Sequence, residues 1–89
     1  FHVDKTFLTC EGIDLENGIT EYDDQEADIK KSMAASAKQV VLMADADKFN
    51  RTSFIRFLEL DRLHAIVTNE KPDENWRNFL AGTPIEWIW

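Results

Sequence analysis

Apolar residues occur along the chain in short blocks, and the pattern within each block predicts a strand or a helix. Residues 3–10 mix Val, Thr, Phe and Leu in the manner of a strand, which Gly12 then interrupts. Residues 40–44 are apolar without alternation, as is typical of a parallel strand covered on both faces. A β-branched run at 64–68 and an alternating segment at 85–89 predict two more strands.

Two helices are predicted between these strands. Asp23 and Glu26 have the spacing of an N-cap and its capping-box partner, and sequence rich in Ala, Met and Lys continues to Lys38. Pro72 and then Asp73 open a second helix that runs to Ala81, and Gly82 ends this helix.

The remaining segments are predicted to be irregular. Residues 11–22 hold two glycines among acids and are interpreted as a loop, and residues 45–60 as irregular or weakly helical. Strands and helices then alternate, which predicts an α/β fold with an open, largely parallel sheet flanked by helices. Because no helix precedes the first strand to cover the other sheet face, we interpret residues 1–89 as part of a larger domain.

Composition restricts the class of protein. With 44% hydrophobic and 30% charged residues the chain is globular rather than disordered. The longest apolar run, residues 40–44, is far shorter than the roughly 20 residues that a membrane span requires. The single cysteine, Cys10, cannot form an internal disulfide, and the cytoplasm is the expected location.

Charge is distributed unevenly. The net charge is −7, and residues 11–28 contain eight acids and no base. Such a segment repels a phosphate backbone. Any contact with DNA is therefore expected to come from residues outside this chain.

One face of the predicted first helix carries both apolar and charged side chains. A helical wheel places Glu26 and Lys30 within the stripe formed by Ile29, Met33 and nearby alanines. A charge on the core side is costly unless it is paired or bound to a ligand. Two interpretations stay open. One is a Glu–Lys pair at the helix edge, worth about 0.2 to 0.5 kcal/mol; the other is a polar cleft that both side chains face, near an anion-binding helix N-terminus.

Polar residues also follow the second predicted strand. Ligands of open parallel sheets lie beyond the carboxyl ends of the strands, where Asp45 and Lys48 are expected, facing the same cleft as Glu26. An ammonium suits a phosphate and a carboxylate suits a hydroxyl, so this pair fits a phosphorylated polyol; a solvated turn is the alternative. Asp4 and Lys5 point to opposite faces of the first strand, so both cannot enter one pocket.

The remaining reactive residue types do not indicate a metal, a cofactor or a nucleophile. His2 and His64 are far apart and lack spaced Cys or His companions, so no metal site is expected. Cys10 has no adjacent base to activate it and is interpreted as a packed thiol. Trp87 and Trp89 suit either packing or an oligomer surface.

Six short motifs occur in order over residues 1–70. They are Val3–Leu8, Gly12–Ile13, Gly18–Thr20, Glu26–Lys30, Ala44–Phe49 and Ile66–Thr68. Together they resemble the effector-binding domain of DeoR-type transcriptional regulators. In that family a winged helix-turn-helix reads DNA and the C-terminal domain binds a phosphorylated sugar or a related metabolite. The C-terminal domain of that family resembles ribose-5-phosphate isomerase and glucosamine-6-phosphate deaminase in fold.

The resemblance implies an effector site and a domain organisation. The residues it assigns to the site are Lys5, Glu26, Lys30, Asp45 and Lys48, with Asp4 and Thr20 as further candidates. It also implies that the DNA-binding domain and the start of the sensor precede this chain. The sequence departs from the family at Asn69, where an acid is more common, and at Cys10–Glu11, where small or acidic residues are usual.

We therefore expect the effector sensor of a DeoR-type regulator, usually a repressor of sugar metabolism, that catalyses no reaction and forms a homo-oligomer. One alternative is a sugar-phosphate isomerase with Glu26 as general base and Lys48 as phosphate contact. The sequence keeps only parts of the isomerase motifs. Another alternative is an oligomerisation module whose interface is formed by the final strand, which ends in Trp87 and Trp89, and by a surface with Phe54 and Phe57.

Overall fold

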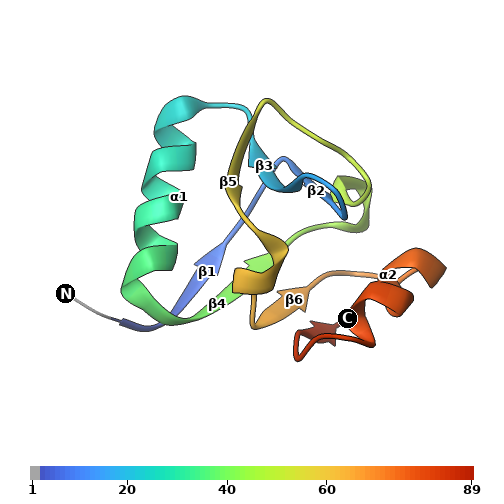
Figure 1. The fold of residues 1–89 in the computed structure, drawn as a ribbon. Coiled ribbons are helices and arrows are strands. Elements are labelled where there is room, and N and C mark those ends of the chain that lie inside the picture. The colour runs from blue at the N-terminus through green and yellow to red at the C-terminus, as the bar shows by residue number, and fades with distance from the viewer. Residues whose placement is uncertain (1–2) are drawn as a thin grey trace.

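Four parallel strands form the larger of two sheets in the structure, a computed structural model that describes residues 3–89. The strands, in their order across the sheet, are β1 (Val3–Leu8), β4 (Ala37–Met43), β6 (Ala65–Val67) and β7 (Glu86–Ile88) (Figure 1). The register places Leu8 beside Leu42 and Leu42 beside Ile66. The predicted largely parallel sheet is confirmed. His2 lies outside the described residues.

A smaller antiparallel sheet is built from segments that were predicted to be irregular. Its strands are β2 (Gly12–Asp14), β3 (Gly18–Glu21) and β5 (Ile55–Leu58). The interpretation of residues 11–22 as a loop is wrong. The Asp14 carboxylate accepts the backbone N–H groups of Glu16 and Asn17 at 3.2 and 3.1 Å, so polar residues close a hairpin here. Strands of three or four residues are too short to show periodicity in the sequence.

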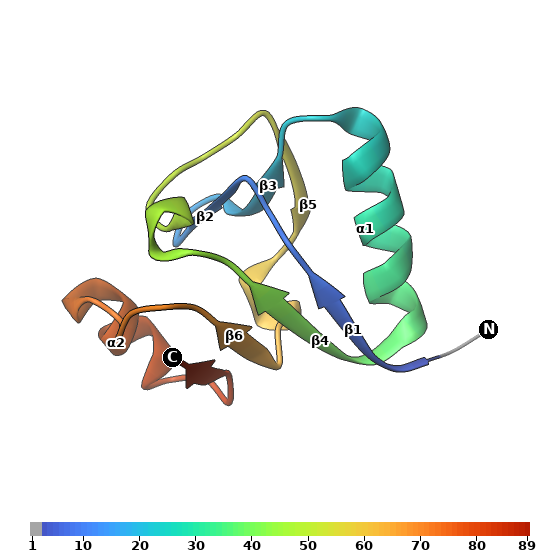
Figure 2. The same cartoon turned by 180° about the vertical axis from the view of Figure 1, so that it is seen from behind.

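Helix α1 (Asp24–Ser36) begins at the predicted capping box and packs against strands of both sheets (Figures 1 and 2). Asp23 Oδ2 accepts the backbone N–H of Glu26 at 3.0 Å. The helix ends at Ser36 rather than at Lys38, because Ala37 already belongs to β4.

The second helix, α2 (Glu74–Leu80), begins directly after Asp73, as predicted, but ends before Ala81. Asp73 Oδ1 accepts the backbone N–H of Trp76 at 2.9 Å. Single 3₁₀ turns follow β4 and β5 in the chain, at Ala46–Lys48 and Leu60–Arg62.

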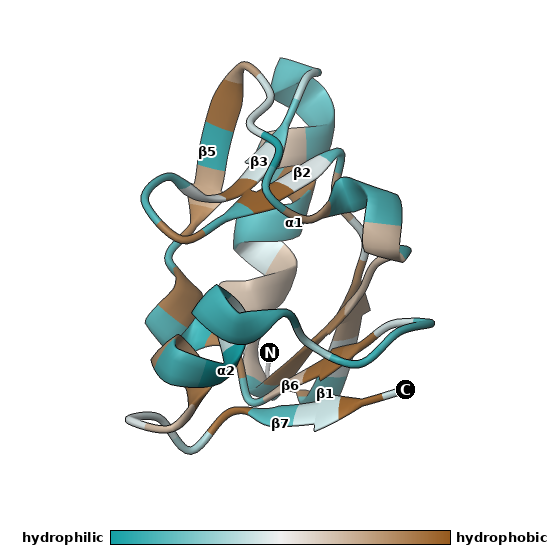
Figure 3. Cartoon of the chain, turned by 90° about the vertical axis from the view of Figure 1, so that its right-hand side faces the viewer, coloured by the Kyte–Doolittle hydropathy of each residue, from teal (hydrophilic) through white to brown (hydrophobic). Residues whose placement is uncertain are grey.

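The core lies between the two sheets and the helices. Apolar segments concentrate in the strands of both sheets (Figure 3). The largest fully buried apolar side chains are Leu8, Ile13, Ile19, Val40, Leu42, Ile66 and Trp76. Phe57 is buried as well, so its predicted place on a surface is wrong, whereas Phe54 is 85% exposed. The difference arises because β5 turns Phe57 toward α1, and Phe54 precedes the strand.

The buried face of α1 is rotated away from the predicted apolar stripe. Ile29 and Met33 are 56% and 40% exposed, whereas Ala27, Lys30 and Ala34 are buried. Small alanine side chains allow the helix backbone to approach the sheets closely. The helix therefore packs through its alanines rather than through its largest apolar residues.

One face of the parallel sheet is partly exposed to solvent in the described part of the chain, residues 3–89. Thr6 and Leu8 of β1 are buried, but Phe7 between them is 54% exposed. Met43 of β4 is 41% exposed. Because side chains alternate along a strand, the exposed residues mark the sheet face that is turned away from the core.

Replacing Gly12 by Ala should destabilise the protein, because a Cβ there would lie 2.5 Å from the carbonyl oxygen of Arg51. We expect the free energy of unfolding to fall by about 1 to 3 kcal/mol, measured by urea denaturation. Gly82→Ala is the matched control, since the nearest atom to its Cβ would be 3.9 Å away. Its effect should stay below about 1 kcal/mol. Equal losses in both variants would contradict the close approach of β2 to Arg51.

Candidate functional site

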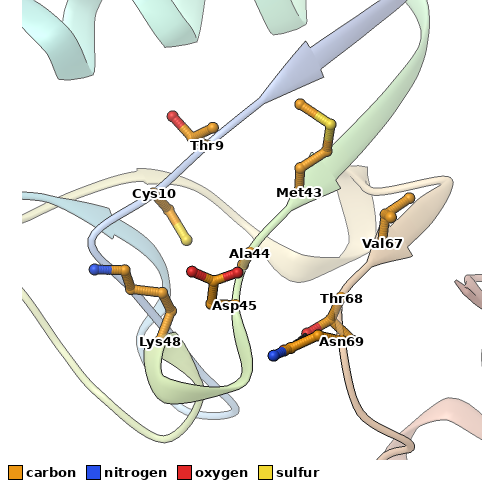
Figure 4. A pocket seen from close by; sticks show the side chains of 9 residues that line it. All are labelled: Thr9, Cys10, Met43, Ala44, Asp45, Lys48, Val67, Thr68 and Asn69. Carbon is orange, nitrogen blue, oxygen red and sulfur yellow. Dashed lines mark hydrogen bonds between the residues drawn. The ribbon is translucent and has the colours of Figure 1, made fainter. Parts of the chain in front are cut away.

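Three neighbouring parallel strands end at one edge of the larger sheet, and a pocket of about 440 Å³ lies beyond these ends. Residues at or just after the ends of β1, β4 and β6 line it: Thr9, Cys10, Met43, Ala44, Asp45, Lys48, Val67, Thr68 and Asn69 (Figure 4). This is the position at which open parallel sheets bind ligands.

Asp45 and Lys48 lie in the turn that follows β4, where the sequence placed them. The backbone N–H of Lys48 donates to the carbonyl oxygen of Asp45 at 3.0 Å and closes the turn. Figure 4 shows both side chains at the pocket. The Lys48 ammonium lies 3.7 Å from the Glu11 carboxylate, and the Lys48 side chain is 28% exposed. Its charge is therefore paired but accessible.

Other polar residues of the pocket were missed by the sequence analysis. Asn69 Oδ1 accepts the backbone N–H of Ala46 at 2.8 Å and the hydroxyl of Thr68 at 3.4 Å, which ties the turn after β4 to the end of β6. Thr9, at the end of β1, adds another hydroxyl. The signal was available, because the strand-end rule that singled out Asp45 applies equally to these threonines.

Lys30 is buried close to the pocket wall. Its ammonium donates to Glu21 Oε1 at 3.1 Å and to Thr9 Oγ1 at 3.3 Å, and lies 5.8 Å from the centroid of the Phe57 ring. The side chains of Lys30 and Glu21 are only 10% and 6% exposed. The lysine therefore supports the pocket through Thr9. Glu21 was not singled out from the sequence, because β3 was not predicted.

Glu26 does not line this pocket, contrary to the prediction that it faces the same cleft as Asp45 and Lys48. Its side chain is 56% exposed and lies 3.9 Å from the Lys30 ammonium. The alanine face of α1 turns inward and leaves Glu26 at the rim of the helix. The interpretation as an i,i+4 pair at the helix edge describes this geometry.

Three other predicted residues also lie away from the pocket. Lys5 and Asp4 are exposed on β1, and Asp4 lies 3.7 Å from the Lys38 ammonium. Thr20 is buried in the small sheet, where its hydroxyl accepts the backbone N–H of Ser53 at 2.8 Å. Effector binding by these three residues stays a prediction.

Cys10 is buried in the pocket wall, as expected for a packed thiol. Burial raises its pKa to about 12, so the thiol stays protonated at neutral pH.

Among residues 3–89 no group of three or more His, Cys, Asp or Glu side chains could hold a metal. His64 accepts the backbone N–H of Val40 at 3.0 Å. None of the helices in this range is long and apolar enough to cross a membrane.

Glu21→Gln should destabilise the protein strongly, because it removes the only buried carboxylate that pairs with the Lys30 ammonium in residues 3–89. We expect a loss of about 3 kcal/mol in the free energy of unfolding, measured by urea denaturation. Glu26→Gln makes the same chemical change in the exposed partner of Lys30 and should cost less than about 0.5 kcal/mol. Two losses of similar size would show that the Glu21 pair is not a buried one.

Cys10 should resist alkylation in the folded protein. At pH 8 a pKa of about 12 leaves far less thiolate than the ordinary pKa of 9.0, and burial also restricts access. Iodoacetamide modification, followed by mass spectrometry, should be at least about a hundredfold slower in the folded than in the urea-unfolded protein. Comparable rates in the two states would rule out a packed, protonated thiol.

Comparison with known proteins identifies the family of this chain. The family described as the DeoR C terminal sensor domain matches residues 1–70. The HTH-type transcriptional regulator IolR of Bacillus subtilis is 34% identical over 89% of this chain and 32% of its own length. The HTH-type transcriptional repressor GlcR of the same organism is 33% identical over 97% of this chain and 33% of its own length.

A putative aga operon transcriptional repressor of Escherichia coli O157:H7 is 31% identical over 79% of this chain and 26% of its own length. The chain thus spans about a third or less of the length of these relatives. The family match covers more than half of the chain and includes β1, β4, β6 and the turn that carries Lys48. The chain belongs to the DeoR family, and its residues 1–70 match the C-terminal sensor domain of these regulators.

Proposed function

We propose that this chain is the effector-sensing part of a DeoR-type transcriptional regulator. A phosphorylated sugar bound at the strand-end pocket would modulate DNA binding by a winged helix-turn-helix that precedes the chain, together with the start of the sensor. The observation that carries the proposal is the pocket itself, which combines the accessible Lys48 ammonium with hydroxyl, amide and carboxylate groups.

The chemistry of the pocket suits both halves of such a ligand. The partly exposed pair of Lys48 and Glu11 is worth about 0 to 1 kcal/mol, whereas a charge-assisted hydrogen bond from Lys48 to a phosphate contributes about 1.5 to 3 kcal/mol. A phosphate can therefore displace Glu11. The Asp45 carboxylate accepts hydrogen bonds from sugar hydroxyls, and Thr9 and Thr68 can donate or accept.

The net charge of the chain supports the proposal that another part of the protein contacts DNA. With a net charge of −7, the sensor repels the phosphate backbone.

The names of the relatives describe transcriptional regulators and repressors, which supports the same role for the protein that carries this sensor. We place this regulator in the cytoplasm and assign it no cofactor.

The regulator is proposed to act as a homo-oligomer. Tyr22 and Phe54 are 65% and 85% exposed, and their ring centroids lie 6.4 Å apart at the tip of the small sheet. Trp89 is 68% exposed after β7. Exposed aromatic side chains of this kind are enriched in protein–protein contacts.

The isomerase alternative is not supported by the geometry. It assigned general-base catalysis to Glu26, whose side chain lies outside the pocket that contains Lys48. A general base must lie within hydrogen-bonding reach of the proton that it removes. The names of the relatives also describe regulators rather than enzymes.

Lys48→Ala should weaken binding of glucose 6-phosphate, used as the probe, about tenfold to a hundredfold, because it removes the charged donor to the phosphate. A thermal-shift titration measures this, since ligand at 100 times its Kd stabilises the native state by about 2.7 kcal/mol. Lys38→Ala is the matched control: its ammonium is exposed and pairs with Asp4, away from the pocket. Unphosphorylated glucose should bind both variants equally. Equal loss of binding from the two lysine substitutions would contradict the assigned site.

A further inference from the structure

The loop after β4, residues 45–50, is held by elements outside the pocket. It carries Asp45 and Lys48 and ends at Asn50, whose φ of 63° is the only positive value at a non-glycine residue in the described part of the chain. Asparagine tolerates this conformation, but surrounding contacts must maintain it. The Asn50 backbone N–H donates to the Ile13 carbonyl at 2.8 Å, which ties the loop to β2.

The Asn50 side chain makes two hydrogen bonds to the start of α2. Its Oδ1 accepts the indole N–H of Trp76 at 3.0 Å, and its Nδ2 donates to Asp73 Oδ2 at 3.2 Å. Trp76 is only 1% exposed, so water cannot readily replace Asn50 as the acceptor. A buried donor without an acceptor is costly, and this cost opposes movement of Asn50 away from α2.

Packing of aromatic rings joins the same two segments. The Phe49 ring lies 5.3 Å from the Trp76 ring and 5.0 Å from the Trp87 ring, measured between centroids. Phe49 also forms a parallel bridge with Ile13. The two residues that follow Lys48 are thus fixed to α2, to β7 and to β2, while Lys48 itself reaches the pocket.

We propose that Asn50 and Trp76 are positioning residues for Lys48, and that their hydrogen bond holds the loop with its ammonium at the strand-end pocket. This inference rests on the proposed function, because it concerns the residue assigned there to the phosphate. Neither Asn50 nor Trp76 lines that pocket. Any effect of these two residues on ligand affinity must therefore come from the position of the loop that carries Lys48.

The first test compares two tryptophans that undergo the same chemical change. Trp76→Phe keeps an aromatic ring beside Phe49 and removes the N–H that Asn50 accepts. Trp87→Phe also keeps a ring there, but its lost N–H donates to the Glu70 carbonyl at 2.9 Å rather than to the loop. Amide hydrogen exchange is followed by NMR in the ligand-free protein.

The backbone amides of Lys48 and Phe49 close the turn after β4 by donating to the carbonyls of Asp45 and Ala46. Both amides should exchange at least about fivefold faster in Trp76→Phe, and at an unchanged rate in Trp87→Phe. Unchanged exchange of these amides in Trp76→Phe overturns the proposal. Equal acceleration in both variants overturns it as well, because loosened ring packing and not the hydrogen bond would then be responsible.

The second test asks whether Asn50 acts through Lys48. Asn50→Gly keeps a residue that adopts positive φ and removes both side-chain hydrogen bonds. The Kd for glucose 6-phosphate should rise about fivefold when Lys48 is present and should not rise further in the Lys48→Ala background. A rise of the same size in both backgrounds overturns the positioning role.

The two proposals fail in different ways. If neither glucose 6-phosphate nor inorganic phosphate binds the unsubstituted protein, the proposed function fails for these probes. The exchange rates in the ligand-free Trp76→Phe and Trp87→Phe proteins then still decide whether the Asn50–Trp76 bond holds the loop.

Discussion

The buried ion pair between Lys30 and Glu21 joins the parts of this fold. Lys30 comes from α1 and Glu21 from β3, and the ammonium also reaches Thr9 at the end of β1. One cation thus connects the helix, the small sheet and the larger sheet. A buried charge is costly unless a partner lies beside it. The helix and the two sheets are therefore held in an arrangement that brings Glu21 and Thr9 to the Lys30 ammonium.

The pocket depends on this arrangement because no single element contains it. Thr9 follows β1, Lys48 lies in the turn after β4, and Asn69 follows β6. Parallel pairing brings the three strand ends together, and the Asn69–Ala46 hydrogen bond keeps the turn against β6. Segments distant in the sequence converge at this edge, as in other open α/β sheets.

The sequence predicted those parts of the fold whose signals are local. Short windows of sequence showed the apolar run at residues 40–44, the cap at Asp23, the start of α2 after Asp73 and the position of Lys48 after a strand. The small sheet was not, because its strands are short and β3 pairs with β5 from a distant segment. Alternation cannot be recognised over three or four residues.

The same limit applies to the candidate site. Lys30 was correctly placed on the inner side of α1, but its partner Glu21 lies on a strand that was not predicted. Glu26 was placed inward with it, since the wheel was centred on Ile29 instead of on the alanines. Which face of a helix is buried depends on the tertiary packing partner, and hydrophobicity alone does not specify it when small residues form the contact.

The pairing of Lys48 with Glu11 also affects which anions the proposed sensor can detect. Glu11 is attached to the same chain 3.7 Å from the ammonium, so its carboxylate competes at a high effective concentration that does not vary with the composition of the cell. A small anion competes with Glu11 by charge alone, without further contacts to the hydroxyl groups of the pocket. A sugar phosphate adds hydroxyl contacts to its charge, and this combination favours its binding at the proposed site over the binding of simple anions.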